Sequence, residues 1–355
     1  MLFYYLLFFI VLITAFRYSK RQNLGFFWLV VLCFFSMFRA ESVGTDTTHY
    51  LDLYGSMKSY IGMSFTANLG RSLEILFSSI VTLVANFNLP SRFIVIFLSV
   101  TTFLFLHLAF KRFTISYPIG VLLYLITFYL SSFNIARQMC AASILLYGFT
   151  FLFETNRKKY YYIILVLLAT TIHGSSLVYL SLFCFRFLNP NFIRKKTYIS
   201  IAVCYFCVNI LFPFDISAII IGLLGSGSSY TYYAARAITH GRSFFGALED
   251  IMVFIPLILI FNQCVKSQLD KFDLLFYITI VCTFLISNMQ SDISRVLFPI
   301  IMFQIIYISH KVYTRKISIY NIAIVIFIFV KMFFTLYGAS QGLGQVSPYL
   351  IDFNL

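Results

Sequence analysis

Residues 93–110 read FIVIFLSVTTFLFLHLAF and are followed at once by Lys111 and Arg112. An apolar stretch of this length can cross the hydrocarbon layer of a bilayer, which is roughly 30 Å thick. A basic pair directly after such a stretch is typical of a cytoplasmic loop. The stretch therefore predicts a transmembrane helix that ends on the inside of a membrane.

The rest of the 355-residue chain has the same character. Hydrophobic residues make up 61% of it and charged residues 11%, and its mean hydropathy is +0.90. A water-soluble chain of this length could not bury so much apolar surface. The first apolar run begins at Met1 without a charged n-region or a cleavage site, so a retained span is expected there. The cysteines lie inside apolar runs and lack the partners of a metal site, so neither disulfides nor metal are expected.

The basic residues determine the predicted orientation. Sixteen of the 26 Lys and Arg residues fall in six short clusters between apolar runs. The clusters are Arg17/Lys20/Arg21, Lys111/Arg112, Arg157/Lys158/Lys159, Arg194/Lys195/Lys196, Lys266/Lys271 and Lys311/Arg315/Lys316. Cytoplasmic loops carry such clusters under the positive-inside rule. The net charge of +14 is therefore interpreted as a topology signal, and no nucleic-acid partner is expected.

If all six clusters lie inside, about twelve spans with both chain ends outside satisfy the pattern. The predicted spans are 1–16, 24–38, 93–110, 118–131, 138–153, 160–172, 175–188, 198–213, 244–262, 273–287, 295–309 and 318–338. The predicted fold is an all-α polytopic transmembrane bundle that forms a single integral membrane domain over 1–355. A first external loop is expected at 39–92 and a second at 213–243, where tyrosines could stack on sugar rings.

One apolar run, residues 73–89, does not fit this count, because a crossing there would place Lys111 and Arg112 outside. Glu74, Ser78, Thr82 and Asn86 recur in it every four residues and form a polar stripe. An amphipathic helix in the outer membrane interface shows that pattern. We therefore predict an external juxtamembrane helix, and the alternative is a thirteenth span.

Three arginines stand at the predicted outer ends of spans. Arg39 opens FRAESVGTDTTHY, Arg137 lies in SSFNIARQMCAAS, and Arg295 lies in NMQSDISRVLFP. Arginine is costly at a lipid-facing position, so it usually faces a bundle interior or a water-filled cavity. Converging guanidinium groups suit a diphosphate, because the planar fork pairs with phosphate oxygens. The alternatives are interfacial snorkelling and pairing with nearby acids such as Asp46 and Asp292.

His173 and the outer acids are the other candidates for chemistry. His173 lies in LLATTIHGSSLVYL, at a tight outer turn, where it could bind phosphate, relay a proton or merely cap a helix. Asp46, in VGTDTTHY, is the best candidate for a general base, although an aspartate in such a turn often only caps the next helix. Asp52, Glu74 and Asp292 lie on the same side. The sequence contains no zinc-protease helix, phosphate-binding glycine loop or serine-nucleophile elbow.

The chain resembles the EpsG-type branch of the Wzy polymerases, which build O-antigen, capsule and exopolysaccharide. The resemblance rests on the order of several patches, which cover most of residues 1–310. They are FR…VGTDTTHY at 38–50, LE at 73–74, ARQMCAAS at 136–143, NRKKYYY, LATTIHGSSL at 168–177 and SR at 294–295. The His-Gly-Ser-Ser turn departs from the His-Pro or His-Tyr turns of many relatives, which is interpreted as a change in turn geometry.

The resemblance implies a GT-C-like bundle in the bacterial inner membrane, with its active site facing the periplasm or the outside. It implies transfer of a growing glycan from undecaprenyl diphosphate to the non-reducing end of a new lipid-linked repeat unit, without metal, nucleotide or other cofactor. A chain-length regulator and a flippase are the implied partners. Arg39, Arg137 and Arg295 would then bind the diphosphate. Asp46, His173 and Glu74 would be catalytic, with His173 as a phosphate ligand or an acid/base group, while Gln138 and Asp292 would position substrate. Glu74 and Asp292 could instead hold the arginines in place.

Two other classes fit part of the pattern. A flippase for the same lipid-linked unit would also have about twelve spans, but it should show repeated halves with charges at mid-membrane depth, and no internal repeat is visible. An O-antigen ligase would share the donor and differ only in its acceptor. An acyltransferase on sugars should instead place its essential histidine near mid-membrane.

Overall fold

The structure is a computed structural model, and it describes residues 1–58, 74–113, 115–190, 195–211, 244–265, 269–286, 295–314, 319–342 and 345–352. These residues are helical, apart from turns, short extended segments and one isolated β-bridge. The α-helices are α1 (Leu2–Arg17), α2 (Gln22–Met37), α3 (Thr45–Lys58), α5 (Ile75–Asn86), α6 (Arg92–Arg112), α7 (Tyr117–Tyr124), α8 (Ala136–Leu152), α9 (Tyr160–Ile172), α10 (Lys195–Leu211), α13 (Phe244–Cys264), α14 (Lys271–Ile286), α16 (Phe298–Thr314) and α17 (Ile319–Ser340).

Shorter or non-α helices join them. They are the π-helix η1 (Leu125–Tyr129) and the 3-10 helices η2 (Ser131–Phe133), η3 (Arg157–Lys159), η4 (Gly174–Phe187) and η7 (Arg295–Leu297). The chain forms two compact units. The first comprises Met1–Arg186, Ser309–Thr314 and Lys331–Leu355, and the second comprises Phe187–Ile308 and Arg315–Val330.

Helix α8 is the centre of the first unit. It packs against α6 and α9, and nearly all of its residues are buried. Small side chains from Cys140 to Ser143 let neighbouring backbones approach closely, as in many membrane bundles. Helix α2 packs against α6 and α7. Gly25 is required at that contact, because a Cβ there would lie 2.6 Å from the Pro118 nitrogen.

The outward faces of this unit are apolar. Along α1, large hydrophobic side chains such as Leu2, Leu6, Phe9 and Ile13 are exposed, and α2 exposes Phe26, Phe27 and Val30. Exposed apolar surface of this extent marks a membrane or protein contact. Four described helices are long and apolar enough to cross a membrane by length and composition: Arg92–Arg112, Gly246–Cys264, Arg295–Val312 and Ile322–Ser340.

The twelve apolar stretches expected to span the membrane are helical over most of their described residues. Four of them meet the length and composition criteria, so the number of twelve spans stays a prediction. A GT-C-like arrangement also stays a prediction. The second expected external loop, 213–243, lies outside the described residues.

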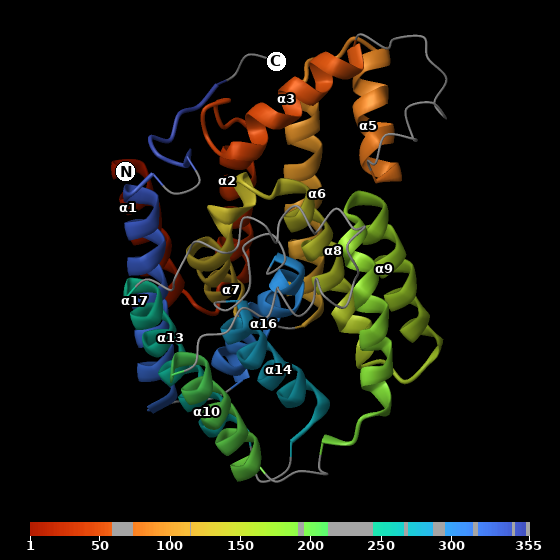
Figure 1. The fold of residues 1–355 in the computed structure, drawn as a ribbon. Coiled ribbons are helices and arrows are strands. Elements are labelled where there is room, and N and C mark those ends of the chain that lie inside the picture. Colours follow the sequence, from red (N-terminus) through yellow and green to blue (C-terminus); the bar gives the residue numbers. More distant parts are fainter. Residues whose placement is uncertain are drawn as a thin grey trace. The chain divides into compact units, whose positions relative to one another are not determined.

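Two helices lie at the end of the first unit where α6 and α8 begin. Helix α3 contacts α5 and α6, and α5 also contacts α9 (Figure 1). The sequence predicted α5 as an interfacial helix, and its 12 residues span about 18 Å. The polar stripe on α5 does not face water along its length, because Ser78 and Thr82 are buried while Ile75 and Phe87 are exposed.

Candidate active site

Five of the residues singled out in the sequence meet at the end of the first unit where α6 and α8 begin. Arg39 follows the last turn of α2, Asp46 lies in the first turn of α3, and Glu74 directly precedes α5. Arg137 lies in the first turn of α8, and His173 follows the last residue of α9. Because three helices begin here and two end here, residues up to 134 positions apart in sequence are brought together.

Asp46 connects α3 to the start of α8. Its Oδ2 accepts a hydrogen bond of 2.8 Å from the backbone N–H of Ala136, the first residue of α8. The Tyr50 hydroxyl donates to the same oxygen at 2.7 Å and accepts a 3.2 Å bond from the Arg137 N–H. The first N–H groups of a helix have no partner inside the helix, so Asp46 and Tyr50 together cap α8.

Glu74 joins Arg137 and His173. Its Oε2 lies 2.7 Å from Nη1 of Arg137, and its Oε1 accepts a 3.1 Å hydrogen bond from the Gly174 N–H. Nδ1 of His173, a buried atom, lies 3.3 Å from Oε1 without the alignment of a hydrogen bond. The Arg137 guanidinium also lies over the Phe77 ring, 4.8 Å from its centre. These contacts hold the ends of α5, α8 and α9 together.

The two carboxyl groups differ in their pKa. Burial raises the pKa of Asp46 above its ordinary value, and the bonds from Tyr50 and Ala136 offset this only in part. Burial acts in the same direction on Glu74, but His173, the Arg137 charge and the Gly174 N–H outweigh it and lower that pKa to about 2. Environments that drive two carboxyl pKa values apart assign them different chemical tasks. Glu74 is ionised at neutral pH, whereas the raised pKa of Asp46 brings that group closer to exchanging a proton.

Arg39 is buried beside this network, with 1% of its surface exposed. Its Nε donates to Thr47 Oγ1 at 2.8 Å, and its Nη1 donates to the Ser36 carbonyl at 2.7 Å. Its guanidinium lies 5.0 Å from the centre of the Phe133 ring. Burial lowers the pKa of Arg39, and nearby Tyr50 and Asp46 oppose that effect. The buried Arg39 side chain therefore links the end of α2 to the first turn of α3 and so stabilises the loop between them.

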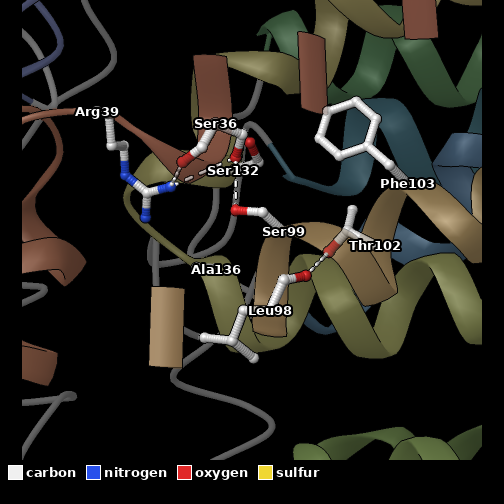
Figure 2. Close-up of a pocket in the computed structure, with 8 residues that line it drawn as sticks. All are labelled: Ser36, Arg39, Leu98, Ser99, Thr102, Phe103, Ser132 and Ala136. Carbon is white, nitrogen blue, oxygen red and sulfur yellow. Dashed lines mark hydrogen bonds between the residues drawn. The ribbon is translucent and has the colours of Figure 1, made fainter. Parts of the chain in front are cut away.

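A small cavity adjoins Arg39 (Figure 2). Its lining consists of Ser36, Arg39, Leu98, Ser99, Thr102, Phe103, Ser132 and Ala136. Its volume of about 10 Å³ is close to the space that one water molecule needs. Nη2 of Arg39 is buried here without a hydrogen-bond partner. The cavity is too small to admit a diphosphate.

The turn before α3 is specified by its own sequence. Gly44 has φ +85, a conformation that glycine adopts without strain, and a Cβ there would lie 2.5 Å from the Phe133 carbonyl oxygen. The Asn134 side chain then accepts a 2.9 Å bond from the N–H of Thr45, the first residue of α3. These two features direct α3 so that Asp46 reaches α8.

The remaining predicted residues lie elsewhere. Gln138 is buried in α8. Arg295 begins η7 of the second unit, where it is partly exposed, so its joining the other two arginines stays a prediction. Asp292 lies outside the described residues. Asp52 is exposed on α3.

Sequence reasoning missed two residues of this network. Tyr50 is four residues after Asp46 on α3, a spacing that places two side chains on one helix face, so the signal was present. Arg92 is buried, and its Nη1 donates to the Arg39 carbonyl at 3.0 Å. Its position at the start of an apolar run resembles that of many interfacial arginines, so the sequence did not distinguish it.

The arrangement is that of an all-helical membrane protein with a charged site at one end of its first unit. It offers a fixed anion, a guanidinium, an imidazole and a carboxyl group of raised pKa. The sequence model of the EpsG family matches residues 22–351. The chain therefore belongs to the EpsG family, a Wzy-like family. Membership indicates a membrane protein of polysaccharide biosynthesis with a polymerase-like activity. No curated protein and no solved structure matches the chain.

Proposed function

We propose that this protein polymerises oligosaccharide repeat units carried on undecaprenyl diphosphate. A hydroxyl at the non-reducing end of a new lipid-linked unit attacks the anomeric carbon of the growing chain. The bond from that carbon to the diphosphate oxygen breaks, and undecaprenyl diphosphate leaves with the electron pair. The hydroxyl proton passes to a base. The lipid diphosphate supplies the energy, so the reaction needs no nucleotide, metal or other cofactor.

The donor diphosphate is assigned to Arg137 and His173. Charge builds up on the leaving diphosphate in the transition state, and fixed donors aimed at it lower the barrier. Glu74 binds the Arg137 guanidinium through Nη1 and lies beside His173, so both groups are oriented before substrate arrives. Its low pKa keeps this anion in place at any physiological pH. Arg295 is proposed as a further phosphate ligand from its sequence context alone.

The proton from the attacking hydroxyl is assigned to Asp46. A general base works best when its pKa is close to the working pH, and burial moves Asp46 in that direction. Arg39 supports this base indirectly, because its Nε donates a hydrogen bond to Thr47, which lies in the same helical turn as Asp46. Gln138 and Asp292 are assigned to the acceptor sugar.

The proposed setting is the inner membrane of a bacterium, with the site facing the periplasm or the outside. The lipid-linked repeat unit reaches that face through a flippase, and a chain-length regulator limits the product. The observation that carries the proposal is the meeting of Asp46, Glu74, Arg137 and His173 from four elements. All four lie in patches that resemble the family.

The test is the length of the glycan made by a strain that lacks this gene. The strain is complemented with wild type, Arg137→Ala, His173→Ala or Asp46→Asn, and its polysaccharide is separated on a gel. We expect single repeat units from the deletion strain and a full ladder with wild type. Each variant should lose at least about tenfold in long products, because removal of one charge-stabilising or acid–base group typically costs 10²- to 10³-fold in rate.

Arg112→Ala is the matched control. Arg112 also pairs with a glutamate, at 2.5 Å from Glu154, but it ends α6 within a predicted cytoplasmic cluster. Its ladder should equal that of wild type at equal expression. If the deletion strain loses even the single-unit band while lipid-linked repeat accumulates, the protein acts in export or ligation, and the polymerase proposal is wrong.

A further inference from the structure

Residues 345–352 lie along the loop that precedes α3. The Ala40 N–H donates to the Leu350 carbonyl at 2.9 Å, and the Asp352 N–H donates to the Phe38 carbonyl at 2.9 Å. The Gly44 N–H donates to the Gln345 carbonyl at 3.0 Å. Three backbone hydrogen bonds thus pair the 345–352 segment with residues 38–44, and Arg39 and Ile351 form an antiparallel bridge.

Tyrosines fix this segment in place. The Tyr4 hydroxyl of α1 donates to the Val346 carbonyl at 2.6 Å, and the Tyr349 hydroxyl donates to the Phe35 carbonyl of α2 at 2.5 Å. The Tyr349 ring also stacks on Phe3, with the ring centres 4.3 Å apart. The segment is therefore anchored on both helices that flank it, and Val346 is buried.

An ion pair completes the contact. Arg92 Nη2 lies 2.5 Å from Asp352 Oδ2, while Nη1 of the same guanidinium donates to the Arg39 carbonyl. Only 9% of the Arg92 side chain and 26% of the Asp352 side chain are exposed. One buried guanidinium thus joins the start of α6, the 345–352 segment and the backbone of the loop before α3. If Asp352 lost its charge, the poorly solvated Arg92 guanidinium would lose this ion pair.

This loop leads directly to the proposed base. Gly44 and Asp46 are two residues apart, and Asp46 must reach the Ala136 N–H at 2.8 Å to keep its place. We propose that Asp352 and Arg92 are positioning residues for the reaction: their ion pair, with the 345–352 segment, fixes the loop that sets Asp46. The inference rests on the proposed function, since it assigns Asp46 the role given there. Neither residue needs to touch the substrate.

The experiment measures initial rates of glycan extension by purified protein in detergent, with lipid-linked repeat unit as substrate. The variants are Asp352→Asn, Asp352→Glu, Arg92→Gln and the double variant Arg92→Gln/Asp352→Asn. Asp352→Asn should lower kcat about tenfold with KM nearly unchanged, because small misplacements of a catalytic group slow the chemical step. Asp352→Glu should restore most of the rate. The double variant should lose no more than the worse single variant, because the two residues act as one unit.

Glu154→Gln is the matched control, since it breaks another arginine–carboxylate pair of 2.5 Å in the same unit and should leave kcat unchanged. A purely structural role predicts a lower melting temperature with kcat per folded molecule unchanged, and that result overturns the inference. An Asp352→Asn variant with the kcat of wild type also overturns the inference. If wild type forms no polymer, the proposed function fails, and hydrogen exchange of residues 38–50 still decides whether the Arg92–Asp352 pair fixes this loop. Faster exchange in Asp352→Asn then supports it, and equal exchange overturns it.

Discussion

Glu74 shows how a single residue can serve several partners at once. Its two oxygens contact the Arg137 guanidinium, the Gly174 N–H and the His173 ring. Because its pKa falls from 4.5 to about 2 on folding, the anion stabilises the folded state. That stabilisation is fully present above about pH 4.5 and is lost as pH falls towards 2.

We therefore predict that wild type and Glu74→Gln differ in their dependence on pH. The variant should be less stable at pH 6, by at most about 3 kcal/mol, and the difference should shrink as pH falls from 4.5 to 2. Thermal unfolding of the detergent-purified proteins across that range measures it. A constant difference over the whole range would show that Glu74 is not the group that titrates.

For single residues, the sequence was informative at positions where a charged side chain beside an apolar span costs free energy. Arg137, Glu74 and His173 were predicted because charged and titratable groups beside apolar spans are rarely without a function. A contact between Glu74 and an arginine was one option that the sequence left open, but residues 74, 137 and 173 have no shared spacing that would select Arg137 and His173 as its partners. Arg92 was missed because its partner, Asp352, lies 260 positions away in the sequence.

Among the elements, α3 depends most on the turn before it. We predict that Gly44→Ala destabilises the first unit by about 2 kcal/mol or more, because it combines a positive φ with a clash on the Phe133 carbonyl. Gly342→Ala is the control. Gly342 has φ +76, but a Cβ there would meet nothing within 4 Å, so it should cost only about 1 kcal/mol. Equal losses of melting temperature would show that the Phe133 contact can relax.

The helices themselves could be predicted from the sequence, but the face of each helix that packs inward was harder to predict. Long apolar runs specify helices because every backbone group must find its partner within the segment in a bilayer. Helix α3 was not predicted, because TDTTHYLDLYGSMK has no strong apolar periodicity. The polar stripe of α5 was recognised, but part of it packs inward, since Ser78 and Thr82 are buried where α5 meets α3, α6 and α9.

For the whole molecule, the orientation in the membrane is the prediction with the widest consequences. Single cysteines are introduced into a cysteine-free background at Glu41, an exposed residue of the loop before α3, and at Lys158, in a basic cluster. An impermeant maleimide should label Glu41→Cys in intact cells and Lys158→Cys only after the membrane is opened. Both positions are exposed on the protein, so the maleimide can react at either one from its own side of the membrane. A reversed labelling pattern would invert the topology and place the candidate site inside.

Composition and charge were sufficient to predict a helical membrane protein, because both are properties of the whole chain. They could not predict the division into two units or the location of Arg295 in the second. The pairing of residues 345–352 with the loop before α3 could not be predicted either, since an irregular segment held by backbone hydrogen bonds has no periodic signature in sequence.

The pairing of residues 38–44 with 345–352 also has a consequence for biosynthesis. A membrane protein is made and inserted from its first residue onward, and α1 to α17 all precede residue 345 in the chain. The loop before α3 can therefore take up its final hydrogen bonds only after α17 has left the ribosome. A nascent chain that is inserted but has not yet reached residues 345–352 lacks these bonds, so the loop that carries Asp46 is completed late in synthesis.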